Sequence, residues 1–275
     1  MLVIEIKVLG EFEATYDGNP IALQPMQHVV ILVLLCAGGL LTRDRMVQLL
    51  WDRPSAGSVK TLHTHLSRIG KGVQAAGGSP DELVVTVPLG GGRFGYRLAG
   101  DLEVDAEHFR RLVDAGSDSY RQGLIEEAGT QLSDALKLRE RGRPAVEVAG
   151  RPFAVDFIHG LDETYKTALI ASFKVGITLG RHREAVGQLR QLARRWPGEG
   201  EIWELLAHAL YRSDRMAEAS DVCREAIDTM RAEGADDRFF LDLQRDVLQG
   251  VPPKRGPLPA PRPASAEPGR LSLAG

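Results

Sequence analysis

The clearest hydrophobic pattern in the chain lies between Val59 and Val73. Apolar residues occupy positions 59, 62, 66, 69 and 73, at intervals of three and four residues in turn. With 3.6 residues per helical turn these positions form one stripe, so the segment is predicted to be a helix with a single buried face. The opposite face carries Lys60, Thr64, Ser67, Arg68 and Lys71 and no carboxylate.

This polar face has the chemistry of a surface that reads DNA. Cationic and hydroxyl side chains hydrogen-bond to phosphates and base edges, whereas a carboxylate would repel a phosphate backbone. The segment therefore favours a recognition helix that enters the major groove. An ordinary solvated surface helix is the alternative, and the flanking segments help to decide between the two.

The N-terminal segments have the pattern of strands. Leu2–Leu9 and Glu11–Tyr16 alternate between apolar and polar residues, as half-buried strands do. Asp17–Pro20 is dense in turn-forming residues, and Ile21–Leu23 is predicted to be a short third strand. Together these segments predict a small antiparallel sheet.

Two further helices are predicted between this sheet and the stripe. Gln27–Ala37 is strongly apolar and is followed by Gly38-Gly39, which favours the end of a helix. Thr42 is suited to cap a helix over Arg43–Trp51. The inward-facing residues of that helix are predicted to be Met46, Leu49 and Leu50. A proline, a serine and a glycine at positions 54, 55 and 57 separate it from the stripe.

A hairpin is predicted after the third helix. Leu83–Val87 and Arg93–Leu98 read as strands joined by Pro88–Gly92, with Arg93 beside three glycines. A linker or a phosphate-binding loop is the alternative for the glycines, but they lack the spacing of a phosphate loop and open no helix. The order of sheet, three helices and hairpin predicts a winged helix-turn-helix, in which the hairpin is the wing and Arg93 reaches DNA.

The second half of the chain is predicted to be helical from about Asp105 onward. Three segments share small or apolar residues at offsets of four and seven. These are Ala128, Leu132 and Ala135, then Ala185, Leu189 and Leu192, then Ala219, Cys223 and Ala226. The second and third sets lie 34 residues apart, which is the period of tetratricopeptide repeats. We therefore predict a stack of helix pairs, with a plain helical bundle as the alternative.

Charge is distributed unevenly along the 275 residues. The formal net charge is -3, yet positions 43–97 hold eight basic residues against four acidic ones. A basic module on an acidic body suits a protein that touches nucleic acid with one part only.

Cysteine use and the two chain ends add further expectations. Cys36 and Cys223 lie in apolar helical surroundings and are predicted to be core residues rather than a disulfide.

The first five residues lack the features of a signal peptide, and the apolar run Val29–Leu41 is too short to span a bilayer. We expect a soluble, cytoplasmic protein associated with the nucleoid. Pro252–Gly275 holds seven of the fifteen prolines and is predicted to be a disordered tail.

Six stretches of sequence occur together in a defined order. They are Val8–Gly10, Leu41–Trp51, Leu62–Ile69, Gly95–Leu98, Asp105–Phe109 and Leu210–Ala219. This combination resembles the Streptomyces antibiotic regulatory proteins, from about Ile4 to Gln249. The resemblance implies an α+β fold, with an OmpR-type winged helix over residues 1–100 and a tetratricopeptide-like bacterial transcriptional activation domain over residues 101–250, before a tail over 251–275.

The resemblance also implies a function and partners. Members of this family activate the genes of secondary-metabolite clusters, bind direct repeats near promoters and recruit RNA polymerase by touching its sigma factor. For this chain it implies a contact with sigma factor through the wing or through residues 52–57. Two copies are expected head to tail on double-stranded DNA, so self-association on DNA is possible in this scheme, and no membrane is involved.

The family's DNA contacts are carried onto this chain by position. They fall on Arg43, Thr61, Thr64, Ser67, Arg68, Lys71 and the wing. From the residues themselves we add Lys60, and His65 at the edge of the face. Arg68 is expected to read a guanine with two hydrogen bonds, Lys60 and Lys71 to hold phosphates, and Arg43 to fix the register on the backbone.

The sequence departs from the family's pattern at four places. His63 stands where relatives usually have a glutamine, and Gly70 where they usually have a basic residue, which removes one candidate contact. The wing carries an insertion over Leu89–Phe94. Arg139–Pro144 replaces a segment that contains tryptophan in relatives, and it reads as a solvated basic connector.

Two rival classes of function are weighed against a DNA-binding activator. One is an adaptor in which the helical repeats bind protein and the winged helix does not bind DNA, or a repressor without activation. The other is an enzyme, but no nucleophile elbow, carboxylate pair, phosphate loop or metal-ligand cluster appears. His63 and His65 lie about 200° apart around a helix and cannot share a metal ion. We therefore expect no catalysis, no cofactor and no metal.

Overall fold

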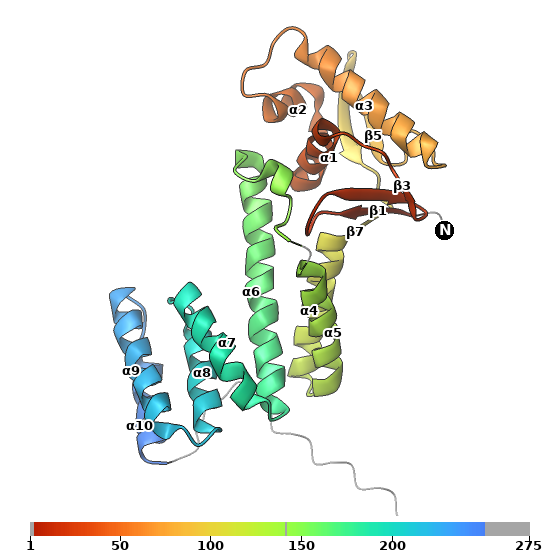
Figure 1. Ribbon diagram of the computed structural model, residues 1–275. Helices are drawn as coiled ribbons and strands as arrows, with labels where there is room; N and C mark the ends of the chain where they lie inside the picture. The colour runs from red at the N-terminus through yellow and green to blue at the C-terminus, as the bar shows by residue number, and fades with distance from the viewer. Residues whose placement is uncertain (1–2, 141, 251–275) are drawn as a thin grey trace, which may run out of the picture. The chain divides into compact units, whose positions relative to one another are not determined.

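The computed structural model describes residues 3–140 and 142–250 (Figure 1). These residues form two compact units. The first extends to Asp114 and also includes Ser133–Ala168, and the second consists of Ala115–Leu132 and the residues from Leu169 onward. The prediction of a tail over 251–275 falls outside the described residues.

The first unit begins with a four-stranded sheet in the order β3-β2-β1-β7. Its strands are β1 (Ile4–Lys7), β2 (Glu13–Tyr16), β3 (Asn19–Pro20) and β7 (Leu102–Val104). β1 and β2 are antiparallel, with Ile4 opposite Tyr16, while β7 lies parallel to β1 on its other side. The predicted sheet is therefore present, and it gains a parallel strand that the sequence analysis did not foresee.

The predicted third strand over Ile21–Leu23 is wrong. Asp17 and Gly18 both have a positive φ, of 49° and 79°, as a two-residue hairpin turn requires, so the chain already returns to β2 at Asn19. Ile21 follows the strand and is buried, and its backbone N–H donates to the carbonyl oxygen of Ala14 at 2.8 Å.

Three helices follow, as predicted: α1 (Pro25–Ala37), α2 (Arg43–Leu50) and α3 (Ser58–Ala75). Gly38, with a φ of 62°, is the C-cap of α1. The hydroxyl of Thr42 accepts a hydrogen bond from the backbone N–H of Arg45, which confirms Thr42 as the N-cap of α2. Met46 and Leu50 are buried and Leu49 is partly buried against the core.

The wing is an antiparallel hairpin of β5 (Val84–Gly90) and β6 (Arg93–Leu98), and β4 (Leu41–Thr42) pairs with β6 on its other edge. Gly90, Gly91 and Gly92 all have a positive φ, so the tip uses backbone conformations that other residues rarely adopt. The order of sheet, three helices and wing confirms the predicted winged helix-turn-helix.

The first unit also contains residues beyond the winged helix. It includes the start of α4 (Asp105–Arg121), the end of α5 (Ile125–Arg139), two short 3₁₀ turns, η1 (Val146–Val148) and η2 (Pro152–Ala154), and the start of α6 (Val155–Thr178). The carboxylate of Asp105 accepts hydrogen bonds from the backbone N–H groups of Val8 and Leu9, at 2.8 and 3.2 Å. Because Phe109 and Val148 belong to the same core as Val8, these segments share one hydrophobic interior with the sheet and α1.

The second unit contains α7 (His182–Arg195), α8 (Gly200–Tyr211), α9 (Met216–Ala232) and α10 (Arg238–Leu248), and each packs against the next. Two turns in it are equivalent at an offset of 34 residues. The N–H of Arg181 donates to the carbonyl of Gly176 across Gly180, and the N–H of Arg215 donates to the carbonyl of Leu210 across Asp214. The repeated turn and the buried positions of Ala185 and Ala219 match the predicted repeat.

Three smaller expectations have clear outcomes. Cys223 is buried and Cys36 partly buried, both are free, and burial raises the pKa of their thiols to about 12 and about 11. The expectation of a solvated connector is wrong for Arg139, whose side chain is only 11% exposed and pairs with Asp162 at 2.8 Å. No helix among the described residues is long and apolar enough to cross a membrane.

Candidate nucleic-acid interface

The two faces of α3 differ as the sequence pattern predicts. Leu62, Ile69 and Val73 are fully buried, and Val59 and Leu66 pack partly against the same core. The side chains on the other side are exposed: Lys60, Thr61, Thr64, Ser67, Arg68 and Lys71. The helix therefore uses one face to hold the fold and leaves the other open to a partner.

The cations of the exposed face have no partners within the described part of the chain. The side chains of Lys60, Arg68 and Lys71 make no hydrogen bond and no ion pair there, and α3 contains no acidic residue. A free cation can replace the counterions of a phosphate backbone without first breaking a bond within the protein. This face is therefore available for an anionic partner.

The hydroxyl groups on the same face differ in what they can offer. Thr61 donates to the carbonyl of Gly57 at 3.1 Å, and Thr64 donates to the carbonyl of Lys60 at 3.0 Å. Their oxygens remain able to accept a hydrogen bond, for example from a base amino group, and their methyl groups can contact a thymine methyl. Ser67 makes no such bond within the described residues, so its hydroxyl is free to donate to a phosphate.

His65 lies at the edge of this face and is only partly exposed. Its Nδ1 is buried with no hydrogen-bond partner. Burial, and to a smaller extent the charge of Arg68, lower the pKa of its imidazole below 6.5, so the ring is neutral at neutral pH. His65 therefore adds no positive charge to the surface.

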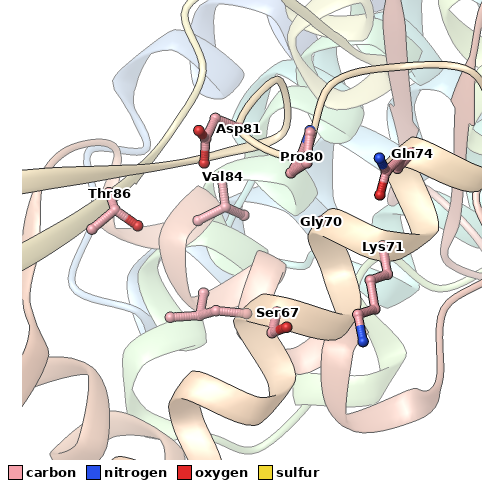
Figure 2. A pocket seen from close by; sticks show the side chains of 9 residues that line it. Ser67, Gly70, Lys71, Gln74, Pro80, Asp81, Val84 and Thr86 are labelled. Atoms are coloured by element: carbon pink, nitrogen blue, oxygen red, sulfur yellow. The ribbon is translucent and has the colours of Figure 1, made fainter.

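A hollow of about 370 Å³ runs along the C-terminal half of the face (Figure 2). Ser67, Lys71 and Gln74 line it from α3, and Thr86 lines it from the wing strand β5. The remaining lining residues are Leu66, Gly70, Pro80, Asp81 and Val84. The hollow lies between α3 and the wing strand β5, and the carboxylate of Asp81 gives it one side that disfavours a phosphate.

Gln74 and Thr86 were missed by the sequence analysis. Gln74 continues the series of Ser67 and Lys71 at helical spacing, which would have identified it. Thr86 lies in a strand, and only the folded chain brings it to the same hollow as α3.

Gly70 has a structural explanation. It is buried, and a Cβ atom added there would lie 3.0 Å from the Cβ of Pro80. Position 70 therefore faces the loop that follows α3, and a side chain there would crowd Pro80.

The remaining predicted contacts lie on other elements of the first unit. Arg93 is exposed at the wing tip, and its side chain forms no hydrogen bond or ion pair among the described residues. Arg43, at the start of α2, is paired with Asp44 at 3.1 Å between Nε and Oδ1. It also lies close enough to Tyr96 for its charge to lower the pKa of that phenol, against the larger rise caused by burial. Arg43 is thus the one predicted DNA-contacting cation that already has an acidic neighbour in the described structure.

Comparison with known proteins gives consistent results for sequence and structure. The bacterial transcriptional activator domain matches residues 104–238. The chain is 30% identical to the regulatory protein DnrI of Streptomyces peucetius over 261 residues, which cover 90% of this chain and 93% of DnrI. It is 29% identical to the regulatory protein AfsR of Streptomyces coelicolor over 89% of this chain and 24% of AfsR.

A solved structure extends the likeness to three dimensions. It is that of Mycobacterium tuberculosis EmbR in complex with a low-affinity phosphopeptide, with a TM-score of 0.80 and 26% identity over 92% of this chain and 66% of that one. In sequence the transcriptional regulatory protein EmbR is 27% identical, and the match spans only 58% of its length. The winged helix, the activator domain and the match to nearly all of DnrI lead to one conclusion: the chain belongs to the Streptomyces antibiotic regulatory protein family of transcriptional regulators.

Proposed function

We propose that this protein is a sequence-specific DNA-binding activator of a secondary-metabolite gene cluster. It binds direct repeats near promoters and recruits RNA polymerase through its sigma factor. The observation that supports this most strongly is the exposed face of α3, which presents Lys60, Arg68 and Lys71 without partners in the described structure and without a carboxylate on the helix.

In this proposal the two predicted domains have separate roles. The winged helix over residues 1–100 binds DNA, and residues 101–250 form the helical activation domain. The proposal includes no catalytic step and no cofactor, and it places the protein on the nucleoid in the cytoplasm.

Each DNA-binding side chain has a role that its chemistry allows. Arg68 lies in the middle of the exposed face, and its planar guanidinium can donate two hydrogen bonds to a guanine. Lys60, about two turns before Arg68, and Lys71, about one turn after it, hold phosphates. Thr61 and Thr64 accept from base amino groups, and Ser67 donates to the backbone at the hollow.

Contacts outside α3 fix the position of the protein on the duplex. Arg93 reaches the backbone or the minor groove from the wing, and Arg43 binds the backbone once it exchanges Asp44 for a phosphate. Two copies bind head to tail, because direct repeats place identical half-sites in the same orientation. The loop over residues 52–57 or the wing then contacts sigma factor.

The proposal is tested by DNA binding and transcription measured together. A mobility shift on promoter fragments with short direct repeats should give specific complexes, and run-off transcription with RNA polymerase should rise when the protein is added. Arg68→Glu should abolish both, whereas Arg183→Glu, at an exposed arginine of α7, should change neither.

Two results would contradict the proposal in different ways. Specific binding without any rise in transcripts would indicate a repressor or an antagonist. Absence of DNA binding would leave the rival function, a protein-interaction adaptor, which the repeated helix pairs of the second unit favour.

A further inference from the structure

The loop between the two helices of the helix-turn-helix is exposed along its length and tied at both ends. Residues 52–57 are all exposed. At the α3 end the backbone N–H of Ser55 donates to the hydroxyl of Ser58 at 2.9 Å, and the N–H of Ser58 donates to the carbonyl of Ser55 at 3.0 Å. Exposed loops that a rigid scaffold positions often carry binding residues.

The other end of the loop is tied by a residue about one hundred positions away. The guanidinium of Arg151 donates to the carbonyl oxygen of Leu50, the last residue of α2, at 3.0 Å. Its second terminal nitrogen lies 3.3 Å from the carboxylate of Asp52, the first exposed residue of the loop. One planar group therefore holds both the helix end and the loop start.

The C-terminus of α2 benefits from a cation at this place. The last carbonyls of a helix lack partners within the helix and carry a partial negative charge. α2 has no basic residue in its last turn. Arg151 supplies from the activator domain the charge that the helix itself lacks.

The backbone that carries Arg151 is itself fixed to the first unit. The N–H of Ala145 donates to the carbonyl of Val8 at 2.7 Å, and the N–H of Phe12 donates to the carboxylate of Glu147 at 3.2 Å. Val148 and Ala154, on either side of Arg151, are fully buried in the shared core. The backbone on both sides of Arg151 is therefore fixed in position, so that the side chain of Arg151 can hold the loop in place.

We propose that Arg151 is a positioning residue: it holds the loop over residues 52–57 in the conformation that docks on sigma factor. This inference rests on the proposed function, in which that loop contacts sigma factor. It predicts that activation depends on a residue outside the winged helix, even when DNA binding is complete.

The test compares Arg151→Ala with Arg143→Ala. Arg143 is an exposed arginine of the same segment with no hydrogen bond or ion pair in the described structure. Hydrogen exchange of the amides of residues 52, 53 and 55–57 should be about fivefold faster in Arg151→Ala, because the loop opens locally more often. Affinity for the promoter should stay within about twofold, since Arg151 forms its side-chain hydrogen bonds and its ion pair with Leu50 and Asp52 and none with α3 among the described residues. Run-off transcripts at saturating protein should fall several-fold, and Arg143→Ala should match the wild type in all three measurements.

Arg151→Lys separates positioning from charge alone. Lysine keeps the positive charge but cannot hold two acceptors with one planar group, so exchange and activation should be restored only in part. Thermal unfolding of each variant shows whether the fold is intact.

The outcomes separate this inference from the function on which it rests. Unchanged exchange of the loop in Arg151→Ala would overturn the inference, and so would faster exchange with full activation. A wild-type protein that binds DNA but raises no transcription would contradict the proposed function, whereas the exchange rates would still decide whether Arg151 positions the loop.

Discussion

The arginines of α9 and α10 and the cations of α3 are arranged in opposite ways. Every arginine between positions 215 and 245 forms an ion pair with a carboxylate two to six residues away. The three cations of α3 have no such neighbour among the described residues, although each of the three helices buries a set of apolar residues.

This difference separates helices that each bury an apolar face but arrange the charges on their exposed face in different ways. Pairs of opposite charge three or four residues apart stabilise a helix only by a few tenths of a kcal/mol, but they leave it locally neutral. α3 gives up that stabilisation and keeps an open positive surface. The comparison therefore predicts that α3 binds an anion and that α9 and α10 do not.

The largest effect is expected on the buried face of α3. Leu62→Ala should lower the free energy of unfolding by about 2–5 kcal/mol, because Leu62 is fully buried in the core and its removal leaves a cavity. Lys60→Ala, two positions away on the exposed face, should change it by less than about 0.5 kcal/mol. Urea denaturation measures both, and similar losses would show that the two faces are not separated as described.

The next effect concerns the sequence specificity of the exposed face. Arg68→Ala should weaken binding to the cognate repeat by about 1–3 kcal/mol more than binding to a scrambled duplex, because only the former offers the guanine that Arg68 is proposed to read. Fluorescence anisotropy on the two duplexes measures the difference. Equal losses on both would make Arg68 a phosphate contact instead.

A smaller effect is expected where the activator domain meets the sheet. Asp105→Asn should lower the free energy of unfolding by about 1–2 kcal/mol. The single amide oxygen can replace only one of the two carboxylate oxygens that accept from the backbone N–H groups of Val8 and Leu9, and the amide nitrogen adds donors that need new partners. Asp101→Asn, at an exposed position four residues earlier, is the control. Chemical denaturation of both variants checks this, and equal stability would mean that the buried carboxylate does not hold the two segments together.

The smallest effect is the pH dependence of His65. Its pKa in the folded protein is lowered below the ordinary 6.5, so the unfolded chain binds more protons as the pH falls. Stability should therefore decrease between pH ~7 and pH ~5.5, and His65→Gln should decrease less over the same range. Thermal unfolding at several pH values compares the two proteins, and parallel curves would mean that His65 does not contribute.

The parts of the fold that sequence analysis predicted correctly are those with local causes. The periodicity of residues 59–73 is a property of a single helix, and α3 extends only to Ser58 and Ala75 beyond the predicted pattern. Thr42 caps α2 through a bond to a residue three positions away. Such features follow from neighbouring residues and need no knowledge of the rest of the chain.

The features that were missed depend on distant segments. β7 is three residues long and becomes a strand only because β1, almost one hundred residues earlier, lies beside it. Arg139 reads as a solvated residue until the fold brings Asp162 to it. Arg151 and Thr86 gain their roles in the same way, since neither has a local pattern that distinguishes it.

The salt dependence of DNA binding tests the central claim most directly. A variant with Lys60, Arg68 and Lys71 all replaced by alanine should be compared with one in which Arg224, Arg238 and Arg245 are replaced. The slope of log K against log salt concentration should shrink by about two to three units in the first variant and stay unchanged in the second. An unchanged slope for the α3 variant, or an equal loss in both, would contradict the assignment of α3 as the DNA-binding surface.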